Sequence, residues 1–143
     1  MSSAESGPSI AVEVTSASTD RIECTVLFRN ETGEELKIWD EGCSWGDAAL
    51  LFEVRQGGQV EKLRRKEQVY TRNFPRTASL PAGGTHQRSV VLTAEEWEPA
   101  ELFGRATEDD AELRPIYRSG DSAEVAEEGV WAGTVSGEFV PLS

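Results

Sequence analysis

Few side chains in this sequence combine the types and the spacing that catalysis requires. The chain has 143 residues and a single histidine, His86, in the stretch HQRSVVLT. A hydrolytic nucleophile needs Ser, Cys or Thr beside a positioned base, and that base is usually histidine. No GxSxG elbow and no cysteine-centred motif accompanies His86. We therefore expect His86 to be a partly exposed strand residue, and we predict no catalytic residue and no enzymatic activity.

Carboxylates are abundant, but their arrangement indicates neither acid–base catalysis nor a metal site. Among 26 Asp and Glu residues, the proximity of any two in sequence is uninformative. The acidic residues of 95–98 fit a helix start, where the dipole favours negative charge. Those at 40–47 and 108–110 do not follow the spacing of a calcium loop, and zinc would require more Cys or His ligands. We predict no metal and no cofactor.

The two cysteines, Cys24 and Cys43, are too few for the disulfide framework of a small secreted protein. Cys24 shares a strand face with Ile22 and Val26, so we expect it to pack as a small buried apolar residue. A bridge between Cys24 and Cys43 is the alternative if the protein is exported.

The most informative cluster is a basic island between residues 62 and 76, which contains six of the 14 basic residues of the chain. Its members are Lys62, Arg64, Arg65, Lys66, Arg72 and Arg76, with Tyr70 and Phe74 among them. Basic and aromatic residues interleaved in this way can hold single-stranded nucleic acid, but Glu61 and Glu67 dilute the patch. Two readings remain open. The island pairs with acidic residues of the C-terminal third within one molecule, or it contacts those of a second copy and builds an assembly.

A tryptophan in the glycine-containing loop expected at 41–47 is a second candidate contact. Trp45 lies beside Gly46 and Asp47, so it belongs either to the core or to a partner interface. Exposed tryptophan is prominent among interface anchors. Trp39 and Trp131 lie on or beside expected strands, and we expect both in the core.

Charge is unevenly distributed along the chain, whose formal net charge is −12. Residues 1–93 carry 11 basic and 13 acidic side chains, whereas residues 94–143 carry 3 basic and 13 acidic. An acidic surface repels phosphate backbones and anionic lipids, which argues against nucleic acid and membrane as principal partners. No segment approaches the roughly 18 consecutive apolar residues of a membrane span. The N-terminal MSSAESGPS has no apolar run, so we expect a cytoplasmic protein, or an exported one whose signal has been removed.

The segment that organises the fold is Arg21–Asp40. Its first half places Ile22, Val26 and Phe28 on one face of a period-two pattern, which is typical of a strand against a core. Polar residues interrupt the pattern at 30–34, and apolar residues resume it at 36–39. This arrangement predicts a strand, a tight connection and a second strand.

The rest of the chain continues in short strands separated by turn signals. Further strands are expected at 10–15, 49–55, 60–63, 85–92, 112–118 and 130–142, the last one bent near Gly137. Gly57 and Gly58 indicate a hairpin turn. Thr93–Glu96 has the pattern of a helix N-cap, and residues 121–128 are expected to form one or two helical turns. Pro115 predicts an edge or bulged strand.

Four stretches carry a resemblance to a known family. They are the strand ending in Phe28-Arg29-Asn30, the Leu36-Lys37-Ile38-Trp39 strand, the arm Phe52 to Gly57, and Leu80-Pro81-Ala82-Gly83-Gly84 before a strand. Over residues 9–93 the chain resembles small Ig-like sandwich modules common in bacteria, and its layout is similar to that of the bacterial intracellular proteinase-inhibitor family. The resemblance implies an Ig-like fold and a peptidase-inhibiting role, although no inhibitory residue matches one for one.

Together these observations predict an all-β protein, an Ig-like two-sheet β-sandwich of about 7–9 mostly antiparallel strands. One or two short helices are expected in the C-terminal half, with residues 1–8 as a flexible leader and 9–143 as a single domain. We predict a non-enzymatic protein-binding module that binds a protein partner or self-associates. The alternative is a peptidase inhibitor that uses the segment Arg72–Arg76. The candidate partner-binding residues are Trp45, Lys62, Arg64, Arg65, Lys66, Arg72, Phe74 and Arg76.

Overall fold

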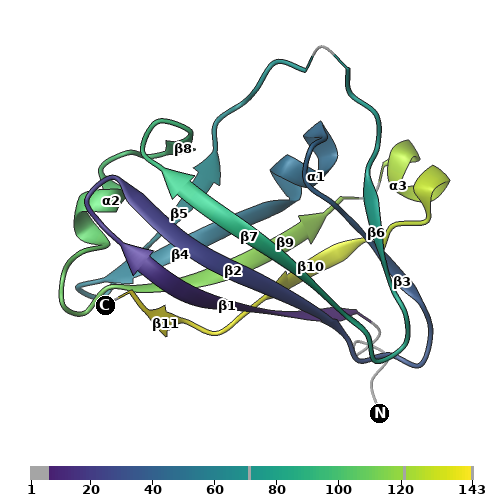
Figure 1. Cartoon of the computed structure of the whole chain (residues 1–143), viewed down its shortest axis with the longest axis horizontal. Helices are drawn as coiled ribbons and strands as arrows, with labels where there is room; N and C mark the ends of the chain where they lie inside the picture. The colour runs from purple at the N-terminus through teal and green to yellow at the C-terminus, as the bar shows by residue number, and fades with distance from the viewer. Residues whose placement is uncertain (1–6, 71, 121, 143) are drawn as a thin grey trace.

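The computed structural model describes residues 7–70, 72–120 and 122–142, which fold mainly into antiparallel β-sheets (Figure 1). The strands are β1 (Pro8–Ala17), β2 (Arg21–Asn30), β3 (Leu36–Trp39), β4 (Leu50–Gln56), β5 (Gln59–Arg65), β6 (Thr77–Leu80), β7 (Thr85–Thr93), β8 (Trp97–Glu98), β9 (Glu112–Ser119), β10 (Gly133–Ser136) and β11 (Val140–Pro141). Three short helices, α1 (Ser44–Ala49), α2 (Leu102–Arg105) and α3 (Ala123–Glu128), lie between strands. The expected β-rich antiparallel architecture is confirmed, although the described residues form 11 strands, more than the number expected.

The strands form three sheets. β2 lies between β1 and β7 in a three-stranded sheet, and a larger sheet has the order β10-β9-β4-β5-β8, with β11 also paired to β9. β3 pairs with β6 in a separate ribbon, so it does not form a hairpin with β2. In Figure 1 the three-stranded sheet crosses in front of the larger one, and the buried apolar side chains form one continuous cluster.

The central strand β2 confirms the sequence prediction for its segment. Ile22, Cys24, Val26 and Phe28 are all buried, whereas the residues between them are only partly covered. Burial of one face of an alternating strand fixes its register, because a slip by one residue would move every apolar side chain to solvent. The strand therefore anchors both of its neighbours.

The predicted hairpin is also present, between β4 and β5. Gly57 and Gly58 have φ angles of 60° and 80°, and the strands pair up to Gln56 and Gln59. Two consecutive positive φ angles are what a two-residue turn of this kind requires. The hairpin turns the chain so that β5 runs back along β4. β5 ends at Arg65, where the long connection to β6 begins.

The region 41–47, which the sequence predicts as a loop, contains the start of a helix. Cys43 caps α1, because its Sγ accepts a hydrogen bond from the backbone N–H of Gly46 at 3.4 Å. Ser, Thr, Asp and Asn are the usual caps, so a cysteine in this role gives no ordinary helix signal. α2 was not predicted either, whereas α3 confirms the helical turns expected at 121–128, of which residue 121 lies outside the described part.

The helix predicted from Thr93 is wrong. The cap contact itself forms, since the Glu96 N–H lies 3.2 Å from Thr93 Oγ1. The chain then turns into β8, where Trp97 pairs with Arg65 and its ring packs edge-on against Phe52 at 5.7 Å. Burial of this large ring against the sheet outweighs the small propensity of a single helical turn.

β9 is not an edge strand, so the first alternative of the prediction, an edge or bulged strand, is wrong. β9 lies inside the larger sheet, between β4 and the pair β10 and β11. The partner strand is interrupted between β10 and β11, where Gly137 donates its N–H to the Pro115 carbonyl at 2.9 Å. Because proline has no N–H to donate, the break falls where a ladder bond is missing. The strand expected at 130–142 is thus only partly present, as β10 and β11 with an interruption that begins at Gly137.

The interior is closed by aromatic side chains from both sheets. Tyr117 is fully buried, its hydroxyl accepts a hydrogen bond from the Trp39 N–H at 2.9 Å, and its ring lies edge-on to Phe28. Trp39 is buried as predicted, whereas Trp131 is half-buried and stacks on Tyr117. Cys24 and Cys43 are both buried and free.

At the N-terminus, Pro8 belongs to β1, and residues 1–6 of the expected leader lie outside the described residues. No helix within residues 7–70, 72–120 and 122–142 has the length and apolar character needed to cross a membrane.

Candidate functional site

The connection between β5 and β6, which we call the β5–β6 loop, comprises residues 66–76 and is described except at residue 71. It contains no helix or strand and arches away from both sheets at the top of Figure 1. The side chains of Val69 and Phe74 are 96% and 70% exposed, respectively. These are the two most exposed large apolar residues of the described chain.

Two hydrogen-bonded contacts hold this loop against α1. Asn73 Oδ1 accepts from the Ser44 N–H at 2.9 Å, and Asn73 Nδ2 donates to Ser44 Oγ at 2.7 Å. The Tyr70 hydroxyl donates to Oδ2 of Asp47 at 2.6 Å. The loop is therefore fastened to α1 on both sides of Arg72, although it has no regular secondary structure.

Asp47 is the polar centre of this contact. It is only 8% exposed, and its Oδ1 accepts from the Gly42 N–H at 3.1 Å and lies 3.9 Å from Nη1 of Arg65. Burial and the hydrogen bond to Asp47 raise the pKa of Tyr70 to about 12. A neutral tyrosine that donates to a buried carboxylate makes a charge-assisted bond, which is stronger than one between neutral groups. The side chain of Asp47 thus joins α1, the turn before it and the loop.

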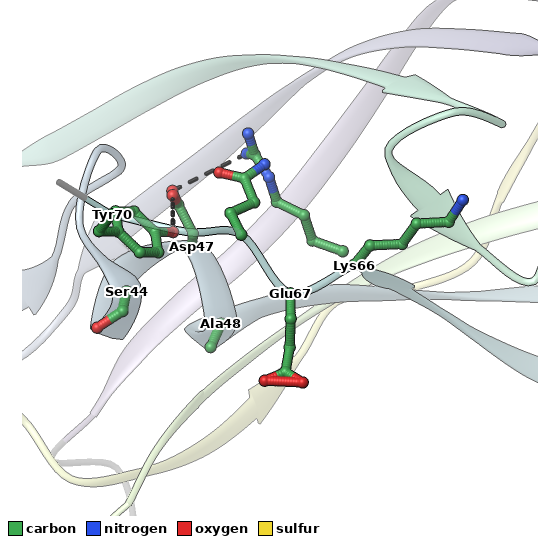
Figure 2. A pocket seen from close by; sticks show the side chains of 8 residues that line it. Ser44, Asp47, Ala48, Lys66, Glu67 and Tyr70 are labelled. Carbon is green, nitrogen blue, oxygen red and sulfur yellow. Dashed lines mark hydrogen bonds and ion pairs between the residues drawn. The ribbon is translucent and has the colours of Figure 1, made fainter.

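A cavity of about 240 Å³ opens beside this centre, between α1 and the beginning of the loop (Figure 2). Its walls are formed by Ser44, Asp47, Ala48, Arg65, Lys66, Glu67, Gln68 and Tyr70. Figure 2 shows Tyr70 directed to Asp47, while Glu67 points away from both. When the Gln68 amide oxygen faces Arg65, Nε and Nη2 of Arg65 lie 2.7 and 2.8 Å from it. The polar groups of the wall therefore bond mainly to one another, which favours a structural role for this cavity.

The predicted basic island is divided between two elements. Lys62, Arg64 and Arg65 lie on β5, whereas Lys66, Arg72 and Arg76 lie on the β5–β6 loop. In the described residues Arg65 alone among the six forms an ion pair, and its partner Asp47 is outside the acidic C-terminal third. The other five side chains are exposed. Direct ion pairing within the molecule thus leaves most of the island unneutralised.

Trp45, the other predicted contact residue, is half-buried on α1. Its ring stacks on Trp39 with centroids 5.6 Å apart and an interplanar angle of 19°. One face of the indole is therefore used inside the molecule. Trp45 supports α1, while Phe74 and Val69 present far more apolar surface to solvent.

A buried arginine that the sequence analysis did not single out lies on the inner face of β7. Arg88 is 6% exposed, and its Nε and Nη1 have no hydrogen-bond partner within the described residues. Its position two residues before Val90 and four before Leu92 places a charge on the apolar face of a strand, and that signal was available in the sequence. Asp47 and Tyr70 gave no such signal, because their contact joins distant segments.

The lone histidine lies beside a carboxylate. His86 is half-buried on β7, as predicted, and its Nε2 lies 3.5 Å from Oδ1 of Asp40. Across the described ranges, no group of three or more His, Cys, Asp or Glu side chains is arranged to hold a metal ion.

Comparison of the chain with models of known protein families, with curated proteins and with solved structures yields no match.

Proposed function

We propose that this protein is a non-enzymatic protein-binding module whose contact surface is the β5–β6 loop. The observation that carries this proposal is the exposure of Val69 and Phe74 on a projecting segment. Large apolar side chains gathered at the surface mark interaction sites in soluble proteins. Aromatic residues in particular supply much of the energy of an interface.

The fastening of the loop to α1 supports the same function. Binding by a mobile segment loses affinity, because side chains and backbone must be ordered in the complex. Here Asn73 and Tyr70 hold the loop before a partner arrives, through their bonds to Ser44 and Asp47. The loop is therefore already ordered in the folded protein, and binding loses little conformational entropy of the loop.

The charge of the loop indicates the character of the partner. Lys66, Arg72 and Arg76 are exposed and form no ion pair with the described residues, so they favour an acidic surface. The chain itself has such a surface, since residues 94–143 carry 13 acidic and 3 basic side chains. The first partner we propose is therefore a second copy. A contact between two different patches can extend into rings or filaments.

Sedimentation velocity at increasing salt tests self-association. We expect assembly at low ionic strength that dissociates as salt screens the charges. The double variant Val69→Ser/Phe74→Ser should remain monomeric, whereas Val60→Ser, which removes an exposed valine from β5 (47% exposed), should behave as wild type. A wild-type protein that is monomeric at every salt and protein concentration excludes the second copy as partner.

Affinity capture with the same variants tests the contact surface for any other protein. A partner retained by wild type and Val60→Ser but lost by the double variant supports the loop. Equal capture by all three places the surface elsewhere and contradicts the proposal.

Peptidase inhibition is the second candidate, and the position of Arg72 favours it. This exposed side chain lies between the two points, Tyr70 and Asn73, at which the loop is fastened from behind. A peptidase could engage Arg72 while the bonds to α1 resist displacement. Trypsin-like enzymes should be inhibited by wild type and not by Arg72→Ala. Unchanged rates in a panel of serine and cysteine peptidases, with the loop uncut, would exclude inhibition.

We also propose that the fold is an Ig-like two-sheet sandwich. The support is that strands of the β1-β2-β7 sheet and of the larger sheet contribute to one cluster of buried side chains. Facing sheets that share a core are the defining arrangement of such sandwiches. In that arrangement the β5–β6 loop lies outside the core and is free to vary. An experimental structure in which the two sheets do not share a core would contradict this assignment.

A further inference from the structure

A polar pocket separate from the loop surface lies between β7 and the elements that face it. Its volume is about 150 Å³, and Arg88 from β7 and Arg65 from β5 contribute to its wall. The acidic residues Glu41, Asp47 and Glu96 also line it. The pocket therefore combines a buried cation with a surrounding set of acidic groups.

The guanidinium of Arg88 is the unusual member of this set. Arginine remains charged in proteins, and a buried charge without hydrogen bonds is costly. The Nε of Arg88 lies 3.5 Å from Oε1 of Glu41 but makes no hydrogen bond to it, and Nη1 likewise has no acceptor in the described residues. Two buried donors of Arg88 therefore have no hydrogen-bond acceptor among the described residues.

The acidic residues around the pocket differ in how readily they can accept a hydrogen bond from Arg88. Asp47 already accepts from Tyr70 and Gly42 and lies near Arg65. The side chain of Glu41 is 58% exposed, so solvent competes for it and weakens its attraction to Arg88. An incoming acceptor can therefore replace Glu41 beside Arg88 without breaking a hydrogen bond to Arg88.

We propose that this pocket binds the carboxylate group of a small organic acid, with Arg88 as the residue that holds it. The planar guanidinium matches a carboxylate in shape and charge. The cavity has about the volume of engineered cavities that hold one benzene molecule, so it admits a ligand of only a few heavy atoms. The three acidic residues of the lining disfavour a doubly charged ion such as phosphate more strongly than a singly charged one. Val69 and Phe74 do not line this pocket, although Asp47, which fastens the β5–β6 loop through Tyr70, and Arg65 do.

Thermal unfolding of the full chain with sodium acetate as the probe tests the proposal. Sodium chloride and sodium phosphate at matched ionic strength and pH are the controls. We expect the Tm to rise with acetate concentration and to reach a plateau. Phosphate should raise the Tm no more than chloride does. The absence of a saturable acetate effect, or a larger effect of phosphate, would overturn the proposal.

Variants separate binding by Arg88 from a general salt effect. Arg88→Met should abolish the acetate effect while leaving the Tm in chloride equal to or above that of wild type, since an apolar side chain replaces an unsatisfied buried charge. Arg118→Met, which alters an exposed arginine of β9, should keep the acetate effect. An acetate effect that persists in Arg88→Met overturns the proposal.

A direct measurement remains decisive if Arg88→Met does not fold. The Nε–Hε resonance of Arg88 in the labelled wild-type protein should shift saturably with acetate, and not with chloride. In Glu41→Gln the same shift should reach saturation at lower acetate concentration, because the competing carboxylate is gone. A resonance that does not respond in either protein overturns the proposal.

Discussion

The hydroxyl of Tyr70 donates a 2.6 Å hydrogen bond to the Asp47 carboxylate, across 23 residues of sequence. The same carboxylate accepts from the Gly42 N–H, so one side chain connects the turn before α1 to the β5–β6 loop. A carboxylate that accepts from two elements fixes their relative position more firmly than either bond alone. The presentation of Phe74 and Val69 therefore depends on the side chain of Asp47.

Removal of the Tyr70 hydroxyl should loosen the loop without disturbing the core. Tyr70→Phe keeps the ring and deletes one hydrogen bond to a charged group, which contributes about 1.5–3 kcal/mol. We expect a lower free energy of unfolding and faster tryptic cleavage after Arg72 and Arg76. Urea denaturation and limited proteolysis measure the two effects. Phe74→Ser, which alters a side chain 70% exposed, should change the unfolding free energy by no more than about 0.5 kcal/mol. Equal proteolysis of Tyr70→Phe and wild type would contradict this role for the hydroxyl.

The two tyrosines of the chain should resist ionisation in alkaline solution. Burial is the main cause that raises the pKa of Tyr70 and of Tyr117 from 10.0 to about 12. The folded state therefore retains protons that the unfolded chain releases near pH 10, so this contribution to stability is complete below about pH 10. It is lost as the pH rises towards about 12. Tyrosinate absorbance, followed together with circular dichroism, should appear only as the protein unfolds. In Tyr70→Phe the absorbance then reports Tyr117 alone, and tyrosinate in a folded sample at about pH 10 would contradict the prediction.

Local sequence patterns predicted the elements whose geometry depends on residues close together in the sequence. The alternation around Val26 and the paired glycines at 57–58 each specify geometry within a few residues, and both are confirmed. Phe74 was already a candidate contact residue. The roles of Asn73 and Tyr70 could not be predicted, because their hydrogen-bond partners lie on α1, which is distant in the sequence.

The remaining features depend on contacts between distant segments or on uncommon signals. α1 was missed because its cap is the sulfur of Cys43 and because Gly46 lowers helix propensity. The predicted cap contact at Thr93 forms, but no helix follows it, because the chain turns to bury Trp97. The inward position of Arg88 was readable from its register with Leu92, yet the missing hydrogen bonds were not. Local preference thus failed where tertiary packing decided the outcome.

Gly46 should tolerate no side chain. A Cβ at this position of α1 would lie 1.6 Å from the carbonyl oxygen of Asp40, which is backbone and cannot rotate away. We expect Gly46→Ala to lower the free energy of unfolding by at least about 3 kcal/mol. Gly104→Ala in α2 is the matched control, since no heavy atom lies within 4 Å of its added Cβ. That variant should gain about 0.5–1 kcal/mol from helix propensity. Urea denaturation of both variants measures the difference, and effects of the same sign would contradict the packing of α1 against Asp40.

The side chain of Asn30 joins the end of β2 to the turn that precedes β7. Its Nδ2 donates to the carbonyl oxygens of Glu34, Leu80 and Pro81 at 2.7, 2.9 and 3.2 Å. Its Oδ1 accepts from the N–H of Thr32 at 2.9 Å. Asn30 is fully buried; its bond to the Leu80 carbonyl is buried, and its bonds to Glu34, Pro81 and Thr32 are partly buried.

Replacement of this amide by a carboxyl group should therefore destabilise the fold in a pH-dependent way. In Asn30→Asp an ionised carboxylate would face three carbonyl oxygens, and the free energy of unfolding should fall by at least about 3 kcal/mol at neutral pH. Only a protonated carboxyl can donate to a carbonyl, so burial in this site raises its pKa above the unfolded value of about 3.9. The raised pKa means that the protonated form is favoured on folding, and the deficit relative to wild type should shrink as the pH falls towards about 4. Urea midpoints of both proteins, measured at neutral and at acidic pH, give this difference. A deficit that stays constant or grows on acidification would show that the amide hydrogens of Asn30 do not hold the two turns together.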